Sequence, residues 1–235
     1  MTSFVRRFKT GRFIWTVLVT FYFLVFFTNF FHDALPDRMT LPVLFAYIFV
    51  LWLSFEYYFG SPFFQSGAVE HSALWRGVFA FFVYPFLGYV AADFIWWRWT
   101  QIPIPVAVTG LLGLAVFGVG TYLRLGTLFG LLGIVQVRPP ARGGKEGTLF
   151  LPEKRFVSLR FQKLARHPRY LATLVQLVGA ALVFRSWGGL ILAAAIGLPL
   201  LLVQARYEDA HLRDLLKNVL KTYTATVPAF WPRLR

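Results

Sequence analysis

The sequence predicts an all-α integral membrane protein with about six transmembrane helices, of which the last two form a short helical hairpin. The chain is 57% hydrophobic and 19% aromatic, and charged residues make up only 14%, whereas soluble domains typically carry about 25%. Long apolar runs recur from residue 13 onward. Most basic residues gather in three segments beside these runs, which is the charge pattern of a multi-pass membrane protein.

The apolar runs define six predicted spans, taken in chain order. They are Phe13–Phe31, Leu41–Gly60, Leu74–Trp97, Pro105 to about Leu123, Tyr170–Phe184 and Leu190–Tyr207. The first is too long for a signal peptide and no small-residue cleavage site follows it, so we expect it to be retained. The third ends in Trp96, Trp97 and Trp99, a cluster typical of a membrane interface.

The last two spans are short for a hydrocarbon core of about 30 Å. We expect them to turn at Ser186-Trp187-Gly188-Gly189. A tight helical hairpin can still cross the bilayer where the lipid thins locally or where its helices pack within a bundle. We therefore expect both halves of the hairpin to cross the membrane.

The formal net charge of +14 has a topological explanation. Of the 24 lysines and arginines, four lie in residues 1–12, ten in 124–169 and six in 206–235. With six spans and a cytoplasmic N-terminus, all three segments face the cytoplasm beside anionic headgroups. We therefore expect a multi-pass protein with cytoplasmic termini and a cytoplasmic active site. No nucleic-acid partner is needed to explain the charge, and no obligate protein partner is evident.

Several types of site are disfavoured. The chain has no cysteine, which excludes disulfides, cysteine-bound zinc and a thiol nucleophile. Three of the four histidines, at positions 32, 71 and 211, are scattered without metal-ligand spacing, so no metal is predicted at His32, His71 or His211. The other polar residues inside predicted spans are Asn29, Glu56, Asp93, Gln176 and Gln204. Glu56 and Asp93 lie near span ends, where interfacial or helix-pairing roles are expected.

Glycines recur along the fourth span at positions 110, 113, 118 and 120, and again beyond Arg124. Small residues allow transmembrane helices to approach closely. The alternative is that these glycines make room for a cofactor against the backbone. The residues alone leave both interpretations open.

The most informative segment is Arg166-His167-Pro168-Arg169-Tyr170. Proline suits the first turn of a helix and disfavours a helical conformation for the residue before it, so the fifth span should begin at Pro168. Unpaired N–H groups at that helix start could hold an anion. The alternative is an ordinary interfacial anchor, with arginine at the headgroups and tyrosine in the aromatic belt.

Two carboxylates, Glu208 and Asp209, follow the sixth span. Neighbouring helical side chains point about 100° apart, so one can face a pocket while the other meets a base. The alternative is a pair of salt bridges to Arg206, Arg213 or the basic residues of the 160s. Anion-binding groups opposite carboxylates would suit a zwitterionic ligand with a positive centre.

These two clusters together resemble the isoprenylcysteine carboxyl methyltransferase and phospholipid methyltransferase superfamily. The matching positions are Gly120, Leu123, Arg124, Arg166, His167, Pro168, Tyr170, Glu208, Leu212, Tyr223, Val227 and Pro228, with Asp209 in place of a second glutamate. Ala172, Lys217 and Leu220 depart from the pattern. The resemblance covers about 105–232, which implies a methyltransferase-like core at 105–235 and N-terminal helices outside it at 1–104.

The resemblance implies S-adenosylmethionine as the cofactor and methyl transfer to a lipidic acceptor. Acceptors in order of preference are a phospholipid amine, a prenyl or other lipid carboxylate, and a small thiol. The implied catalytic residues are Glu208, Arg166 and Tyr170, with Glu208 as the base if the acceptor is an amine. The implied cofactor-binding residues are His167, Pro168, Tyr170, Glu208, Asp209 and Tyr223. The alternatives are a membrane reductase that uses NADPH and a small non-enzymatic transporter.

Overall fold

A computed structural model describes residues 37–65, 77, 79–134, 136–138, 148–150, 165–207, 209–210 and 227–230, with scattered positions between 14 and 25. The chain divides into two compact units. Unit 1 comprises Met1–Val69 and Leu132–Glu153, and unit 2 comprises Glu70–Leu131 and Lys154–Arg235. Apart from one short β-ribbon, the regular elements in these ranges are helical, which confirms the predicted helical class. The predicted boundary between 104 and 105 stays a prediction.

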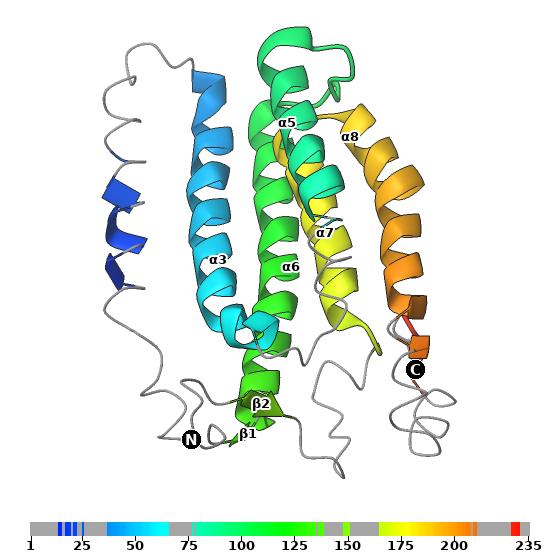
Figure 1. Cartoon of the computed structure of the whole chain (residues 1–235). Coiled ribbons are helices and arrows are strands. Elements are labelled where there is room, and N and C mark those ends of the chain that lie inside the picture. The colour runs from blue at the N-terminus through cyan, green and yellow to red at the C-terminus, as the bar shows by residue number, and fades with distance from the viewer. Residues whose placement is uncertain are drawn as a thin grey trace. The chain divides into compact units, whose positions relative to one another are not determined.

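In unit 1, a short 3₁₀ turn, η2 (Asp37–Met39), leads into α3 (Thr40–Gln65) (Figure 1). The helix agrees with the predicted second span and runs five residues beyond its expected end. Aromatic rings one turn apart contact each other along α3, as expected for residues spaced by three or four. The ring centroids of Phe45 and Phe49 are 5.9 Å apart, and those of Phe49 and Trp52 are 5.4 Å apart.

The β-ribbon in unit 1 was not predicted. Strand β1 (Gln136–Arg138) pairs antiparallel with β2 (Thr148–Phe150), and Gln136 lies opposite Phe150. Val137, Thr148 and Phe150 are residue types that favour extended structure. Each strand has only three residues, which is too short for an alternating pattern to stand out in the sequence.

The first helix of unit 2 covers the end of the predicted third span. It consists of a π-helical turn η3 (Phe79–Val83), α5 (Tyr84–Ala92) and a second π-helical turn η4 (Asp93–Trp97). It ends at Arg98, which adopts a left-handed conformation with φ 56°, and the Arg98 N–H donates to the Asp93 carbonyl at 2.7 Å. The predicted end at Trp97 is confirmed.

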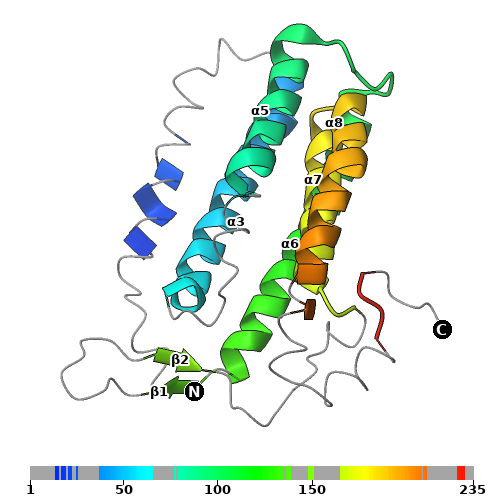
Figure 2. The same ribbon diagram turned by 45° about the vertical axis from the view of Figure 1, so that its right-hand side comes forward.

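The next two helices are α6 (Val106–Ile134) and α7 (Pro168–Val183). The structure extends α6 well past the expected end near Leu123, and it begins α7 at Pro168 as predicted. Within unit 2, α6 and α7 lie side by side in both ribbon views (Figures 1 and 2).

Glycines form the contact between α6 and α7. A Cβ atom added to Gly113 would lie 2.5 Å from the backbone of α7, and one added to Gly120 would lie 2.8 Å from it. A Cβ on Gly179 would lie 2.5 Å from the backbone of α6. Nothing lies within 4 Å of the corresponding position at Gly118. Gly113 and Gly120 therefore serve close helix approach, the first of the two interpretations given above.

The helical hairpin turns earlier than predicted. α7 ends at Val183, Arg185 takes φ 54°, and Ser186 caps α8 (Trp187–Leu192) by accepting the Gly189 N–H at 3.0 Å. The expected turn at 186–189 is wrong because serine is a strong N-cap and starts the helix at once. α8 continues through the π-helical η5 (Ala193–Gly197) to Tyr207, and Trp187–Tyr207 is called the α8 helix below.

Gly188 and Gly189 lie inside the α8 helix instead of forming a turn. A Cβ on Gly188 would overlap the Tyr89 hydroxyl, and one on Gly189 would lie 2.6 Å from the Val90 side chain. These glycines therefore allow α8 to contact α5 closely.

Among the residues that the structure describes, two helices are long and apolar enough to cross a membrane, Val106–Leu128 and Trp187–Tyr207. Thr40–Glu56, Phe81–Trp97 and Pro168–Val183 are apolar but shorter. The predicted first span lies mostly outside the described residues. The number of six spans therefore stays a prediction.

Candidate functional site

The start of α7 is set by its first two residues. Pro168 occupies the first helical turn, and His167 before it has a non-helical backbone with φ −117° and ψ 62°. The N–H groups of Tyr170 and Leu171 both donate to the His167 carbonyl, at 3.1 and 3.2 Å. Pro168 has no N–H group, and those of Tyr170 and Leu171 are already paired. Fewer backbone N–H groups are therefore available to an anion at this helix start than the sequence suggested. Anion binding would depend more on side chains.

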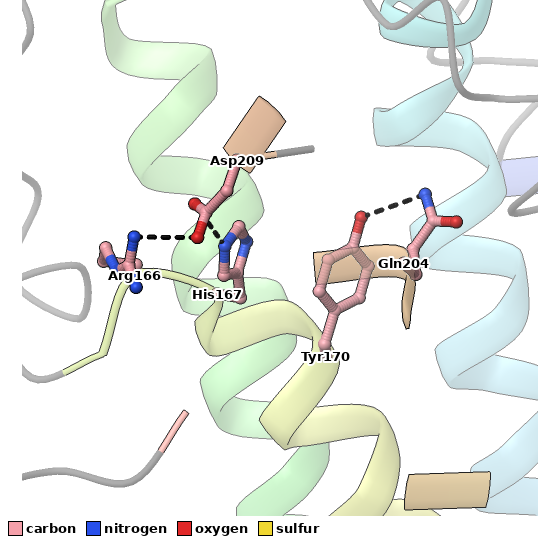
Figure 3. A network of polar contacts seen from close by, with 5 residues as sticks. All are labelled: Arg166, His167, Tyr170, Gln204 and Asp209. Atoms are coloured by element: carbon pink, nitrogen blue, oxygen red, sulfur yellow. Dashed lines mark hydrogen bonds and ion pairs between the residues drawn. The ribbon is translucent and has the colours of Figure 1, made fainter. Parts of the chain in front are cut away.

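Asp209 connects the end of the α8 helix to the start of α7. Its Oδ2 accepts from Arg166 Nη1 at 2.7 Å, and its Oδ1 lies 2.9 Å from His167 Nε2 (Figure 3). The side chains of Arg166, His167 and Asp209 are 15%, 4% and 10% exposed. Arg166 and Asp209 therefore form a largely buried ion pair, and the His167 ring completes the cluster. This agrees with the interpretation of Asp209 as a partner of the basic 160s.

Tyr170 joins the cluster from the first turn of α7. Its ring stacks on His167 with centroids 5.5 Å apart and an interplanar angle of 22°. On its other side, the Tyr170 hydroxyl lies 3.4 Å from Gln204 Nε2 of the α8 helix (Figure 3). Sequence reasoning had recognised Gln204 only as a polar residue within a span.

A second segment pairs with the site through its backbone. The N–H groups of Arg166 and His167 donate to the carbonyls of Pro228 and Ala229, at 2.9 and 3.1 Å. Phe230, next in the chain, is 3% exposed. This pairing gives the segment that contains Val227-Pro228 a structural role. It satisfies the two backbone N–H groups just before Pro168 and so holds Arg166 and His167 in place.

A buried arginine on α6 contacts α7 about one turn beyond Tyr170. Arg124 is 2% exposed and donates from Nη1 to Thr173 Oγ1. Thr173 in turn donates to the Arg169 carbonyl at 3.0 Å. A buried guanidinium is costly unless it is hydrogen-bonded, so this contact ties α6 to the part of α7 that carries the site.

Two buried polar atoms of the site lack a hydrogen-bond partner in the part of the chain that the structure describes. They are Arg166 Nε, a donor, and Gln204 Oε1, an acceptor. Leaving a buried polar group unsatisfied costs about 1–3 kcal/mol. Such atoms are uncommon in folded proteins, so each requires an explanation.

A second polar cluster lies at the hairpin turn, away from this site. The Asp93 carboxylate is fully buried and accepts from Thr100 Oγ1 at 2.6 Å and from Ser186 Oγ at 3.1 Å. It also accepts the N–H groups of Trp99 and Thr100. Arg185 donates to the Ile102 carbonyl in the same loop. The helix-pairing role considered for Asp93 fits these contacts.

The structure brings together five of the seven predicted site residues: Arg166, His167, Pro168, Tyr170 and Asp209. Glu208 and Tyr223 lie outside the described residues, so their predicted roles stay predictions. Gln204 and the 228–229 backbone were missed. The first was visible in the sequence only as an amide within a predicted span, and the second acts through main-chain atoms that carry no sequence signal.

Comparisons with known proteins assign no family to the chain. No family model matches it, and no curated protein matches it either. A functional proposal therefore depends on the residues and geometry of the site.

Proposed function

We propose that this chain is an integral membrane methyltransferase that transfers a methyl group from S-adenosylmethionine to a lipidic acceptor. The observation that carries the proposal is the Arg166–His167–Asp209 cluster with Tyr170 stacked beside it. It joins the two sequence segments on which the resemblance depends, at the ends of two neighbouring helices.

The site contains groups that fit S-adenosylmethionine. Arg166 Nε is a buried donor without a partner among the described residues, and a guanidinium suits the cofactor's carboxylate. The ring of Tyr170 suits a positive centre, because aromatic faces attract cations. Both Asp209 oxygens already face donors, so Glu208 is the better candidate among the two acids to meet the ammonium or sulfonium.

When bound, S-adenosylmethionine supplies an activated methyl group. The chain's own residues would orient the reactants and exclude water. These are the main tasks of an enzyme in methyl transfer, which is a direct displacement at the methyl carbon. His167 and Asp209 would hold Arg166 and Tyr170 in place. A carboxylate acceptor needs no general base, whereas an amine must lose a proton, and Glu208 is the proposed base in that case.

The proposal includes a multi-pass topology with both termini and the site on the cytoplasmic face. It is supported by two of the described helices, Val106–Leu128 and Trp187–Tyr207, which are long and apolar enough to cross a membrane. It is also supported by the three basic segments, which all fall on one side if there are six spans. A lipid acceptor could then reach the site from the bilayer.

Cofactor binding is the direct test. We expect S-adenosylmethionine, and not NADPH, to raise the unfolding temperature of the detergent-solubilised chain. A ligand at about 100 times its Kd adds about 2.7 kcal/mol of stability. Arg166→Gln should abolish the shift. The control is Arg206→Gln, which removes an exposed arginine near the end of the α8 helix and should retain the shift. A shift with NADPH alone would favour the reductase, and equal shifts in both variants would exclude Arg166 from the site.

A further inference from the structure

The buried amide of Gln204 is the starting observation. Gln204 is 2% exposed, its Nε2 lies 3.4 Å from the Tyr170 hydroxyl, and its Oε1 has no partner in the described part of the chain. Figure 3 shows this oxygen on the side of the amide away from Tyr170. Rotating the amide by 180° would only exchange the two ends, so one polar end stays unsatisfied in either orientation.

Gln176 provides the contrast within the same unit. It is also buried, at 5% exposed, but its Nε2 donates to Thr121 Oγ1 on α6 at 3.0 Å. Gln176 therefore joins two helices in the ordinary way for an intramembrane amide. Gln204 makes one long bond to α7 and directs its other end at no described group, so helix pairing explains its Nε2 but not its Oε1.

The position of Gln204 connects it to the candidate site. It bonds to Tyr170, whose ring stacks on His167, and His167 in turn contacts Asp209 (Figure 3). An unpaired carbonyl oxygen in this position accepts only N–H or O–H groups. A bound molecule with such a donor would remove the cost of the unpaired oxygen, and a molecule without one would not.

We propose that Gln204 is a specificity-determining residue that recognises a hydrogen-bond donor on the head of the methyl acceptor through Oε1. The inference rests on the proposed function, since it takes the bound molecule to be the acceptor. It predicts discrimination between two lipid heads of the same charge, one that carries N–H groups and one that does not. It also predicts that the amide is dispensable for the fold.

The test compares two short-chain lipids on the full chain in detergent. Dioctanoyl phosphatidylethanolamine carries an ammonium with N–H groups, and dioctanoyl phosphatidylcholine carries a trimethylammonium without them. We expect the first to raise the unfolding temperature at lower concentration. Gln204→Met should weaken its apparent affinity about three- to tenfold, the usual effect of losing one hydrogen bond, and should remove the preference. Without lipid, this variant should unfold at the wild-type temperature or above it.

Two further variants make the result specific. Gln204→Glu keeps acceptor oxygens and should bind the ethanolamine lipid at least as tightly as wild type. Gln176→Met is the matched control and should retain the preference even where it lowers the unfolding temperature. Weaker binding in Gln204→Glu would show that the amide presents its N–H end, which overturns the inference.

The inference also fails if the two lipids shift wild type equally, if neither shifts it, or if Gln204→Met keeps the preference. S-adenosylmethionine binding to wild type without lipid is measured in parallel. If the cofactor binds but the two lipids are not discriminated, only the proposed role of Gln204 is refuted. No cofactor binding refutes the proposed function.

Discussion

The Asp209 carboxylate holds two side chains of the same short segment in place. Arg166 and His167 are adjacent in the chain and contact different oxygens of Asp209. The sequence offered salt bridges to Arg206, Arg213 or the basic residues of the 160s as one alternative for these acids, and it could not say which of the two neighbouring acids would form them. Helical side chains at consecutive positions point in different directions, and the choice depends on how α8 is rotated against α7.

Replacing Asp209 tests this arrangement. Asp209→Asn keeps the shape and removes the charge, so the bonds to Arg166 and His167 lose their charge assistance. We expect the free energy of unfolding in detergent to fall by about 1.5–3 kcal/mol. Arg206→Gln, at an exposed position of the same helix, should change it by less than about 0.5 kcal/mol. Similar losses in the two variants would contradict the assignment.

Between elements, the contact of α6 with α7 depends on glycine at particular positions. The sequence showed the glycines of α6 but could not identify which ones meet another helix. Gly113 and Gly118 are alike in the sequence, yet only Gly113 lies against α7. Which face of α6 meets α7 is a property of the packed pair, so only the structure separates them.

Gly179→Ala and Gly118→Ala provide a matched pair of tests. The added methyl at Gly179 would meet the α6 backbone at 2.5 Å, and the helices would have to move apart. We expect a loss of about 1–3 kcal/mol in unfolding free energy. At Gly118 the methyl meets open space, and alanine should be neutral or stabilising by up to about 1 kcal/mol. Equal destabilisation would refute the described contact.

The hairpin turn shows a different limit of sequence-based prediction. Ser186 looked like part of a loop because glycines follow it, but its hydroxyl contacts Gly189 N, Thr100 Oγ1 and Asp93 Oδ2. Two of these partners lie 86 and 93 residues away in the chain. Long-range hydrogen bonds of this kind leave no local pattern.

A double-mutant cycle on Asp93→Asn and Ser186→Ala measures this connection. Because the two side chains share a hydrogen bond and a common partner in Thr100, their effects on unfolding free energy should not add. We expect a coupling energy of about 0.5–3 kcal/mol. Additive effects, measured by thermal or denaturant unfolding in the same detergent, would mean that the two residues act independently.

At the scale of the whole molecule, the prediction to test is the membrane topology. The Trp187 N–H donates to the Thr100 carbonyl, so Trp99 lies near the start of the α8 helix, while Ala210 lies beyond its end. Both positions are exposed. If the α8 helix crosses the membrane toward the cytoplasm, these two positions face opposite compartments.

Labelling single introduced cysteines is unambiguous because the chain contains none. In intact cells, an impermeant maleimide should modify Trp99→Cys at once and Ala210→Cys only after lysis. Denatured samples provide the control for full reactivity of each thiol. Modification of both positions from the same compartment would rule out α8 as a span in this orientation.

The backbone pairing of residues 166–167 with 228–229 has a consequence for biosynthesis. Chains are made from the N-terminus, so about sixty residues must be added after Arg166 and His167 before their main-chain N–H groups meet these partners. The nascent chain thus holds the start of α7 with part of its backbone unpaired while α8 is still being made. Premature termination before residue 228 would leave the helices synthesised but the site without the segment that pairs with its backbone.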